Sequence, residues 1–191
     1  FDILMANPPF AGDIKESRII HKYDLGYNEK NKPKSKVGRD ILFIERNLNF
    51  LKPGGRMAIV LPQGRFNNTS DKNIREYISE KARILAVVGL NVNTFKPHTG
   101  TKTSVLFMQK WNDDPKVGSL CPKVKDYPIL FAVSEKSGKD NSGEYVFVKN
   151  GNGQPKLDKN SHLVIDHDLH NHDSELPDGV AEKFIEWAKG E

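Results

Sequence analysis

The hydrophobic and polar positions of the chain fall into alternating blocks, and these blocks predict strands separated by helices. Three short apolar runs have the length and continuity of strands buried in a parallel sheet: residues 1–5, 57–61 and 84–90. Residues 40–52 instead place apolar side chains three and four positions apart, and so does the segment that begins at Ser70 or Asp71. That spacing is typical of one face of a helix.

The ends of these helices are marked by residues with specific backbone roles. Asp40 stands where an N-cap belongs in the first helix, and Ser70 or Asp71 can cap the second. The Pro-Gly-Gly sequence at residues 53–55 ends the first helix with a proline stop and a flexible exit. Residues 63–70 are polar and predict a loop at the carboxyl end of a strand.

A fourth strand is predicted at residues 103–111, after a loop at residues 91–102. No helical pattern separates it from the strand at 84–90, so we expect it to turn back antiparallel, whereas the first three strands run parallel through right-handed crossovers. The fold class is therefore α/β.

Beyond Trp111 the pattern changes and predicts a small extension. We expect a loop at residues 112–126 and a short strand at 127–133. A hairpin turn at 137–143 would lead to a partner strand at 144–149. A Gly-, Asn- and Lys-rich connector at 150–160 and a terminal helix at 180–189 would follow. This predicts two domains, residues 1–111 and 112–191.

Composition narrows the class of protein. The chain has 191 residues, a net charge of +4 and one cysteine, Cys121, which excludes an internal disulfide and is typical of the cytoplasm. No apolar run approaches the length of a membrane span, and no signal peptide is visible. Because the chain starts inside a predicted strand and without Met, we expect it to be a fragment of a longer protein.

The first predicted strand ends in an unusual corner, Asn7-Pro8-Pro9-Phe10. Pro8 holds Asn7 extended, and two prolines prevent further strand or helix. The corner therefore lies at the carboxyl end of a strand, where open α/β sheets bind ligands. The Asn7 side-chain oxygen and the Pro8 carbonyl could accept the two N–H groups of an exocyclic amine, and Phe10 could stack on a planar base.

A polar segment follows at residues 11–40, and its second half is basic. Its cationic residues are Lys30, Lys32, Lys34, Lys36 and Arg39. They are compatible with a solvated surface loop and equally with contacts to phosphate. Ser17, Arg18 and Tyr23 are compatible with a short helix, which the pattern leaves undecided.

The corner resembles the catalytic motif of the amino-methyltransferases that use S-adenosylmethionine, chiefly the DNA adenine-N6 enzymes. Later segments resemble the modification subunits of type I restriction–modification systems: residues 51–56 before a strand ending in Leu61-Pro62, Asn93-Thr94-Phe95, residues 99–106, and residues 131–133 with Gly138, Asp140 and Gly143. The order of these segments after the corner indicates the family more specifically than any single segment does.

This resemblance implies methyl transfer from S-adenosylmethionine to adenine N6 in double-stranded DNA, with base flipping. Asn7, Pro8, Pro9 and Phe10 would be catalytic, and Asn7 and Pro8 would also contact the cofactor. Phe95 would lie in the target-base pocket, and the five basic residues named above would contact phosphate. A specificity subunit and a restriction subunit would be the protein partners.

The resemblance also implies a Rossmann-like class I methyltransferase sheet, whose strand order is 3-2-1-4-5-7-6. The chain supplies counterparts of strands 4, 5, 6 and 7, the last antiparallel. The glycine-containing cofactor motif of the family is missing, because Gly54-Gly55 ends a helix and does not substitute. We therefore expect an uncovered apolar edge at residues 1–5, and we expect residues 1–191 alone to show neither methylation nor tight cofactor binding by calorimetry.

Two other functions stay open. Protein glutamine N5 methyltransferases carry a similar corner, with Tyr commoner than Phe at its last position, and a non-catalytic DNA-binding or assembly module is compatible with a half-domain. A cluster at His162, His167, His170 and His172, with Asp166, Asp168 and Asp173, resembles a metal site only by its density. Its spacing matches no helical pair of ligands, so we expect a solvated connector and no metal.

Overall fold

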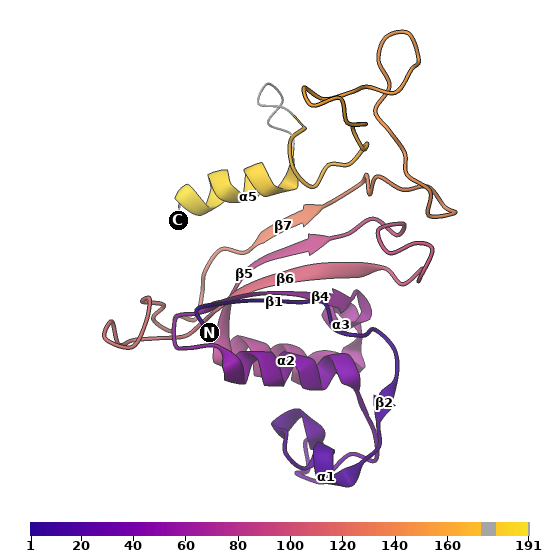
Figure 1. Ribbon diagram of the computed structural model, residues 1–191. Helices are drawn as coiled ribbons and strands as arrows, with labels where there is room; N and C mark the ends of the chain where they lie inside the picture. Colours follow the sequence, from indigo (N-terminus) through magenta and orange to yellow (C-terminus); the bar gives the residue numbers. More distant parts are fainter. Residues whose placement is uncertain (173–178, 191) are drawn as a thin grey trace. The chain divides into compact units, whose positions relative to one another are not determined.

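The structure is a computed structural model, and it describes residues 1–172 and 179–190. The chain divides into two units (Figure 1). The first consists of Phe1–Val87 and Ser104–Ile129, and the second of Val88–Thr103 and Leu130–Glu191. None of the helices in the described ranges combines the length and the apolar character that crossing a membrane requires.

The sheet of the first unit has the order β1-β4-β6-β5, in which the strands are β1 (Ile3–Ala6), β4 (Arg56–Pro62), β6 (Thr103–Lys110) and β5 (Ala82–Gly89). β1 and β4 are parallel. β6 is antiparallel to both neighbours, because its last residue, Lys110, donates to Gly55 O at 2.8 Å and Trp111 donates to Lys81 O at 3.2 Å. This order, with one reversed strand, confirms the predicted part of the class I methyltransferase sheet.

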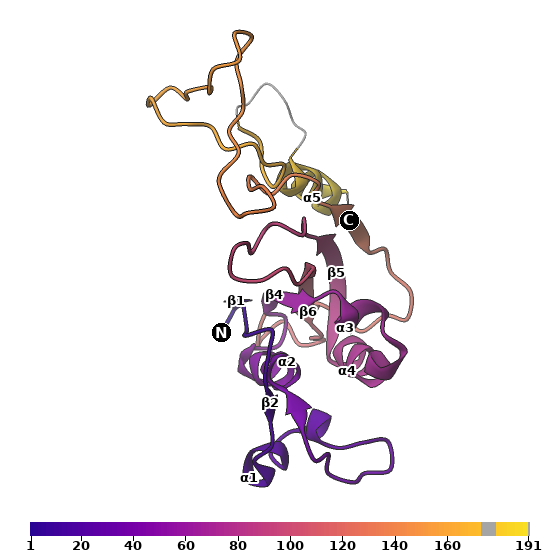
Figure 2. The same ribbon diagram turned by 90° about the vertical axis from the view of Figure 1, so that its right-hand side faces the viewer.

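Helices α2 (Arg39–Phe50) and α4 (Lys72–Lys81) connect the parallel strands, as the apolar spacing predicts. Figure 2 shows both on the same side of the sheet. The apolar core that they form with β4 includes Ile44, Leu48, Ile59, Leu61, Ile74 and Ile78, all nearly inaccessible to solvent. The predicted loop at residues 63–70 is wrong in part, since it contains α3 (Gly64–Asn67) and the start of a 3₁₀ turn, η2 (Thr69–Asp71).

β1 is an edge strand with one exposed face. Ile3 is 71% exposed and Met5 82% exposed, whereas Leu4 and Ala6 are half-buried. The prediction that this apolar run is buried is therefore wrong for Ile3 and Met5. The reason is that alternate side chains of a strand face opposite sides, and in the described residues only the side facing α2 is covered.

Residues 11–40 fold onto α2 and are not a fully solvated loop. They contain β2 (Asp13–Ile14), α1 (Ser17–Ile20), the 3₁₀ turn η1 (Asp24–Gly26) and β3 (Val37–Gly38), with β2 and β3 paired antiparallel. Ile20, Leu25 and Val37 are buried in the core. These three apolar side chains anchor the segment, while its basic part stays exposed.

In the second unit, β7 (Leu130–Val133) and α5 (Val180–Lys189) form within the predicted ranges. Ser134 N donates to Gly89 O at 2.8 Å, so β7 lies beside the end of β5. The predicted pairing of residues 144–149 with the strand at 127–133 is wrong. Residues in that range form isolated bridges instead, such as Lys139 with Tyr145 and Phe147 with Ile165.

Four turns of the chain share one five-residue design. The side-chain oxygen of the first residue accepts the backbone N–H groups of the third and fifth residues, and the fourth residue has a positive φ. The first residues are Asn28, Asp140, Asn150 and Asp158, and the fourth are Asn31, Gly143, Gly153 and Ser161. Short polar side chains and glycine favour this geometry, because they tolerate positive φ and bond the local backbone.

Candidate active site

The Asn-Pro-Pro-Phe corner follows β1 directly at the carboxyl end of the parallel strands. The Pro8 ring is buried, Asn7 and Pro9 are exposed, and Phe10 is half-buried. Within the described ranges, the Asn7 amide makes no hydrogen bond to the protein. The corner therefore presents an amide that is held in place by a buried proline and is available to a ligand.

The far end of the corner is fixed by Gly12, which precedes β2. Its φ of +95° favours glycine, and a Cβ there would lie 3.1 Å from Arg39 Nε. Gly12 O accepts the backbone N–H of Arg39 at 3.1 Å. The short loop between β1 and β2 is therefore tied to β4 through β1, and to the start of α2 through Gly12.

A buried carboxylate holds the next segment on α2. Glu45 is 3% exposed, and its two oxygens accept the backbone N–H groups of Asp24 and Leu25, each at 2.9 Å. Burial raises the pKa of Glu45, although these two hydrogen bonds oppose the shift. Glu45 lies on the buried side of α2, and nothing in the local sequence indicated its partners, which are 20 and 21 positions away.

The basic residues differ in their availability. Lys30 and Lys32 are exposed on the turn that Asn28 organises. Lys34 is half-buried and donates from Nζ to Leu25 O at 3.1 Å, and burial lowers its pKa. Lys36 pairs with Asp13 at 3.0 Å. Lys30 and Lys32 are therefore the members of the set whose ammonium groups are free of partners in the described structure.

An open hollow lies beside this turn and offers room for an anion. Its lining comes from the basic turn, from η2 and from the start of α4: Asn28, Glu29, Lys30, Lys34, Ser70 and Asn73. The lining residues include two lysines, Lys30 and Lys34, and one carboxylate, Glu29. Arg39 lies outside the hollow, against Gly12.

Asp40 does not cap α2, which corrects the prediction from sequence. The N-cap position belongs to Gly38, and the Asp40 carboxylate instead accepts hydrogen bonds from Arg65, which lies in α3. Arg65 also donates from Nη1 to Asp71 at 3.0 Å. Burial alone would lower the pKa of Arg65, but the two carboxylates outweigh burial and raise it. Sequence analysis missed this ion network because its members lie far apart in the chain.

Phe95 belongs to the second unit, in the loop between β5 and β6, and is half-buried. Local hydrogen bonds shape this loop. Thr94 N and the Thr94 hydroxyl both donate to Asn91 O, and Thr99 N donates to Phe95 O at 3.1 Å. The role of Phe95 in a base pocket stays a prediction.

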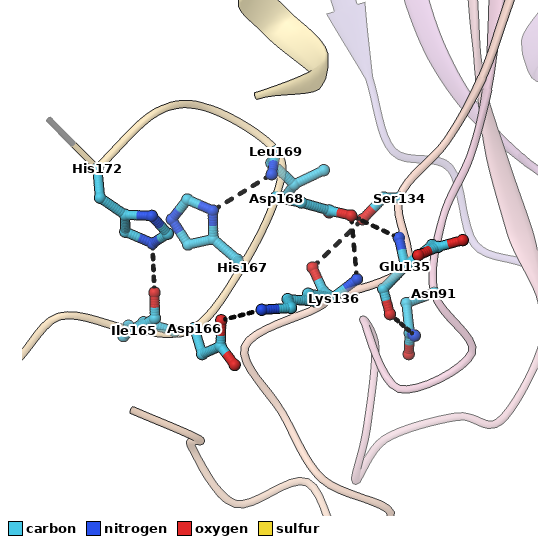
Figure 3. A network of polar contacts seen from close by, with 10 residues as sticks. All are labelled: Asn91, Ser134, Glu135, Lys136, Ile165, Asp166, His167, Asp168, Leu169 and His172. Carbon is cyan, nitrogen blue, oxygen red and sulfur yellow. Dashed lines mark hydrogen bonds and ion pairs between the residues drawn. The ribbon is translucent and has the colours of Figure 1, made fainter. Parts of the chain in front are cut away.

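Three of the four clustered histidines come together, and Figure 3 shows two of them, His167 and His172. The ring centroid of His167 lies 4.4 Å from that of His170 and 4.5 Å from that of His172. Each ring already uses a nitrogen locally, for example His172 Nε2 with Ile165 O at 2.6 Å. No group of ligands that could hold a metal occurs in residues 1–172 and 179–190, and Asp173 lies outside the described residues. Burial lowers the pKa of His167, with the neighbouring histidines adding to the shift.

Comparison with known proteins decides the family. The sequence model of the N-6 DNA methylase family matches residues 1–159. The chain belongs to the N-6 DNA methylase family. The resemblance to type I modification subunits is likewise confirmed by related proteins.

Two curated relatives show how much of a longer protein this methylase chain matches. It is 33% identical over 112 residues to the type I restriction enzyme EcoEI methylase subunit of Escherichia coli. The aligned region covers 57% of this chain and 21% of that protein. It is 27% identical over 115 residues to the type II restriction enzyme and methyltransferase RM.Eco57I of Escherichia coli, which covers 60% of this chain and 12% of that protein.

Solved structures show the same fold. A putative class I S-adenosylmethionine-dependent methyltransferase from Listeria monocytogenes matches with a TM-score of 0.55 and 20% identity, over 69% of this chain and 36% of that one. A chain from a structure of type I restriction–modification complex assembly matches with a TM-score of 0.51 and 18% identity. The match covers 99% of this chain and 28% of that one. The methylase chain therefore has part of a class I methyltransferase fold.

The Asn-Pro-Pro-Phe corner presents groups that suit a polar ligand. The free Asn7 amide provides an acceptor and donors at the strand end. In nucleotide-binding folds, a glycine-rich turn after a strand approaches the cofactor. β1 is instead followed by Asn7, Pro8 and Pro9, and the two prolines cannot form such a turn. The chain thus carries groups suited to the methyl acceptor, and its sequence lacks the cradle for the rest of the cofactor.

Proposed function

We propose that the methylase chain forms the amine-binding side of the active site of a DNA adenine-N6 methyltransferase. The observation that carries the proposal is the exposed Asn7 amide, which has no partner in the described structure and follows β1 directly, with the Pro8 ring buried behind it. Membership of the N-6 DNA methylase family supports the reaction class.

The chemistry follows from the acceptors at this corner. The lone pair of adenine N6 is delocalised into the ring, so the nitrogen is a weak nucleophile. Acceptors at Asn7 Oδ1 and at the Pro8 carbonyl would bind its two N–H groups and favour a more tetrahedral nitrogen. These hydrogen bonds strengthen as positive charge develops on N6, so they stabilise the transition state more than the ground state. S-Adenosylmethionine supplies the methyl group.

Other residues of the chain would hold the DNA. Phe10, half-buried beside the corner, offers a ring face for an adenine that has left the duplex. Phe95 would contact the same base, as the family resemblance implies. Lys30 and Lys32, whose ammonium groups have no partner among the described residues, would bind phosphate, whereas Lys34 and Lys36 are used within the protein. Double-stranded DNA, a specificity subunit and a restriction subunit are the proposed partners.

Substitution of Asn7 in the intact enzyme tests the proposal. We expect Asn7→Ala to lower the methylation rate by a factor of about 100 or more, the effect of removing one group that stabilises a transition state. DNA affinity should stay within a few-fold. Asn49→Ala is the matched control, because Asn49 is also exposed and its side chain makes no hydrogen bond to the described residues. Unchanged turnover in Asn7→Ala would rule out the assignment.

Parallel assays of the intact enzyme separate the competing functions. An adenine-containing duplex and a glutamine-containing peptide should be offered with labelled cofactor. Methylation of the duplex alone is expected. Methylation of the peptide alone would favour a protein glutamine N5 methyltransferase, and DNA binding with no transfer to either substrate would favour a non-catalytic module.

A further inference from the structure

The loop that carries Phe95 is held from outside by the C-terminal extension. Asn91 donates from Nδ2 to Glu135 O at 2.5 Å (Figure 3). Asn93 donates from Nδ2 to Asn141 Oδ1 at 3.1 Å and to Lys139 O at 3.3 Å. Asn91 and Asn93 therefore lie against residues 135–141.

Lys139 closes this contact with a charged donor. Its Nζ donates to Lys96 O at 2.8 Å, next to Phe95 in the sequence. A charged donor makes a stronger hydrogen bond than a neutral one. Lys139 thus holds the backbone carbonyl of the residue that follows Phe95.

Gly143 brings the extension against the same stretch by close packing. Its φ is +95°, and a Cβ at this position would lie 2.6 Å from Pro97 N and 2.8 Å from Pro97 Cδ. Only glycine allows the backbones to approach so closely. The turn that Asp140 organises therefore abuts the loop just beyond Phe95.

The bracing segment is itself fixed by Asp168. One oxygen of this carboxylate accepts the Ser134 hydroxyl at 2.6 Å, and the other accepts the N–H groups of Glu135 at 2.6 Å and Lys136 at 3.2 Å (Figure 3). Asp168 O also accepts Val180 N at 2.9 Å, at the start of α5. The contacts thus run without interruption from α5 through Asp168 to the loop.

We propose that this extension is a brace that positions the Phe95 loop for the target base, and that Asn93, Lys139 and Asp168 are positioning residues. The inference rests on the proposed function, which gives Phe95 its contact with adenine. Hydrogen bonds within the loop determine its conformation, and the contacts with the extension determine its position in the second unit. A loop that is ordered before DNA binds loses less conformational freedom when it meets an extruded base, so the brace favours extrusion and correct alignment.

The test uses the intact enzyme and compares two neighbouring lysines. Lys139→Met removes the hydrogen bond to Lys96 O. Lys136→Met, the control, removes a lysine of the same segment whose Nζ pairs with Asp166 at 2.9 Å. Amide hydrogen exchange in peptides covering residues 91–102 reports loop order without DNA or cofactor. We expect exchange there to rise about ten-fold in Lys139→Met, the loss of one charge-assisted hydrogen bond, and to stay unchanged in Lys136→Met.

Two functional readouts then connect loop order to the base. A 2-aminopurine at the target position should show less extrusion in Lys139→Met, and the methylation kcat should fall about ten-fold with little change in KM for S-adenosylmethionine. Lys139→Arg should restore part of both. Gly143→Ala, which displaces the loop by steric contact with Pro97, should reproduce the pattern.

The outcomes separate the brace from the proposed function. Unchanged exchange in both Lys139→Met and Gly143→Ala would overturn the brace. Faster exchange with unaltered extrusion and kcat would overturn its positioning role. Failure of the unsubstituted enzyme to methylate adenine would instead defeat the proposed function, and the exchange data would still decide whether the loop is braced.

Discussion

Arg65 donates two hydrogen bonds to the carboxylate of Asp40, from Nε at 2.6 Å and from Nη2 at 3.0 Å. Asp40 is 2% exposed and opens α2, whereas Arg65 follows β4 by three residues. β1 is paired with β4, and β2 is paired with β3 immediately before Asp40. The two ends of the Asn-Pro-Pro-Phe corner are therefore both linked to β4, one through a strand ladder and the other through this ion pair.

We predict that Arg65→Met destabilises the protein by about 3 kcal/mol, because it leaves the buried Asp40 carboxylate without its partner. Urea unfolding of the intact protein measures the loss. Arg46→Met is the control, since the Arg46 guanidinium is exposed and only lies over the Phe50 ring at 4.5 Å. Adding Asp40→Asn to Arg65→Met should recover part of the stability. A smaller loss of unfolding free energy in Arg65→Met than in Arg46→Met would contradict the prediction.

Lys110 caps the carboxyl end of α2 from β6. Its Nζ donates to Leu48 O at 2.8 Å and to Leu51 O at 2.9 Å, two carbonyls that the helix leaves unbonded. We predict that Lys110→Met costs about 1–3 kcal/mol and speeds amide exchange in α2. Lys52→Met, which removes only an exposed ion pair with Asp2, should cost far less. Equal effects in the two variants would mean that the cap adds nothing.

The free lysines of the basic turn should govern the salt dependence of DNA binding. Lys30→Ala with Lys32→Ala should weaken binding to all sequences alike and reduce the salt slope by about 2, one phosphate contact for each residue. Lys116→Ala with Lys123→Ala removes the same charge from exposed positions elsewhere in the first unit. Titrations at several salt concentrations measure the slopes, and equal slopes in the two double variants would exclude a specific phosphate contact at the turn.

Asp168 should make the second unit sensitive to acid. Burial opposes ionisation of this carboxyl, but hydrogen bonds from Ser134, Glu135 and Lys136 outweigh burial and hold its pKa below the ordinary value of 3.8. Because the folded pKa is depressed, the carboxylate contributes stability that is complete above pH of about 4 and is lost as pH falls through the folded pKa.

Asp168→Asn should therefore cost about 2 kcal/mol at neutral pH, and the difference from wild type should shrink at lower pH. Amide exchange in peptides covering residues 134–136, followed as a function of pH, measures it. A difference that stays constant down to pH of about 2 would show that the charge of Asp168 is not involved. Asp166→Asn is the control, since its ion pair with Lys136 is more exposed.

The sheet and its main helices were predictable because each depends on a local pattern. The apolar runs predicted β1, β4 and β5, a less regular strand pattern predicted β6, and the helical spacing predicted α2, α4 and α5. The turn at Asp140 was predictable for the same reason, since its side chain bonds residues within four positions.

Features that depend on distant partners could not be read in this way. Asp40 has the sequence context of an N-cap, yet its carboxylate faces Arg65, 25 positions away. Ile3 and Met5 look like buried strand residues, but they are exposed because only the face of β1 toward α2 is covered in the described residues. The docking of residues 11–40 depends on Glu45, and the bracing of the Phe95 loop depends on Lys139, neither of which is signalled locally. The catalytic role of Asn7 stays a prediction.

The four matching turns have a consequence for the order in which the chain folds. Each is closed by hydrogen bonds that span no more than four residues, three of them follow one another between Asp140 and His162, and so they form without closing a long loop. Pairing of β1 with β4 must instead bring Ile3 to Arg56. The extension should thus acquire its local shape on the microsecond scale of hairpins, while the sheet that bears the Asn-Pro-Pro-Phe corner is completed in a later and slower step.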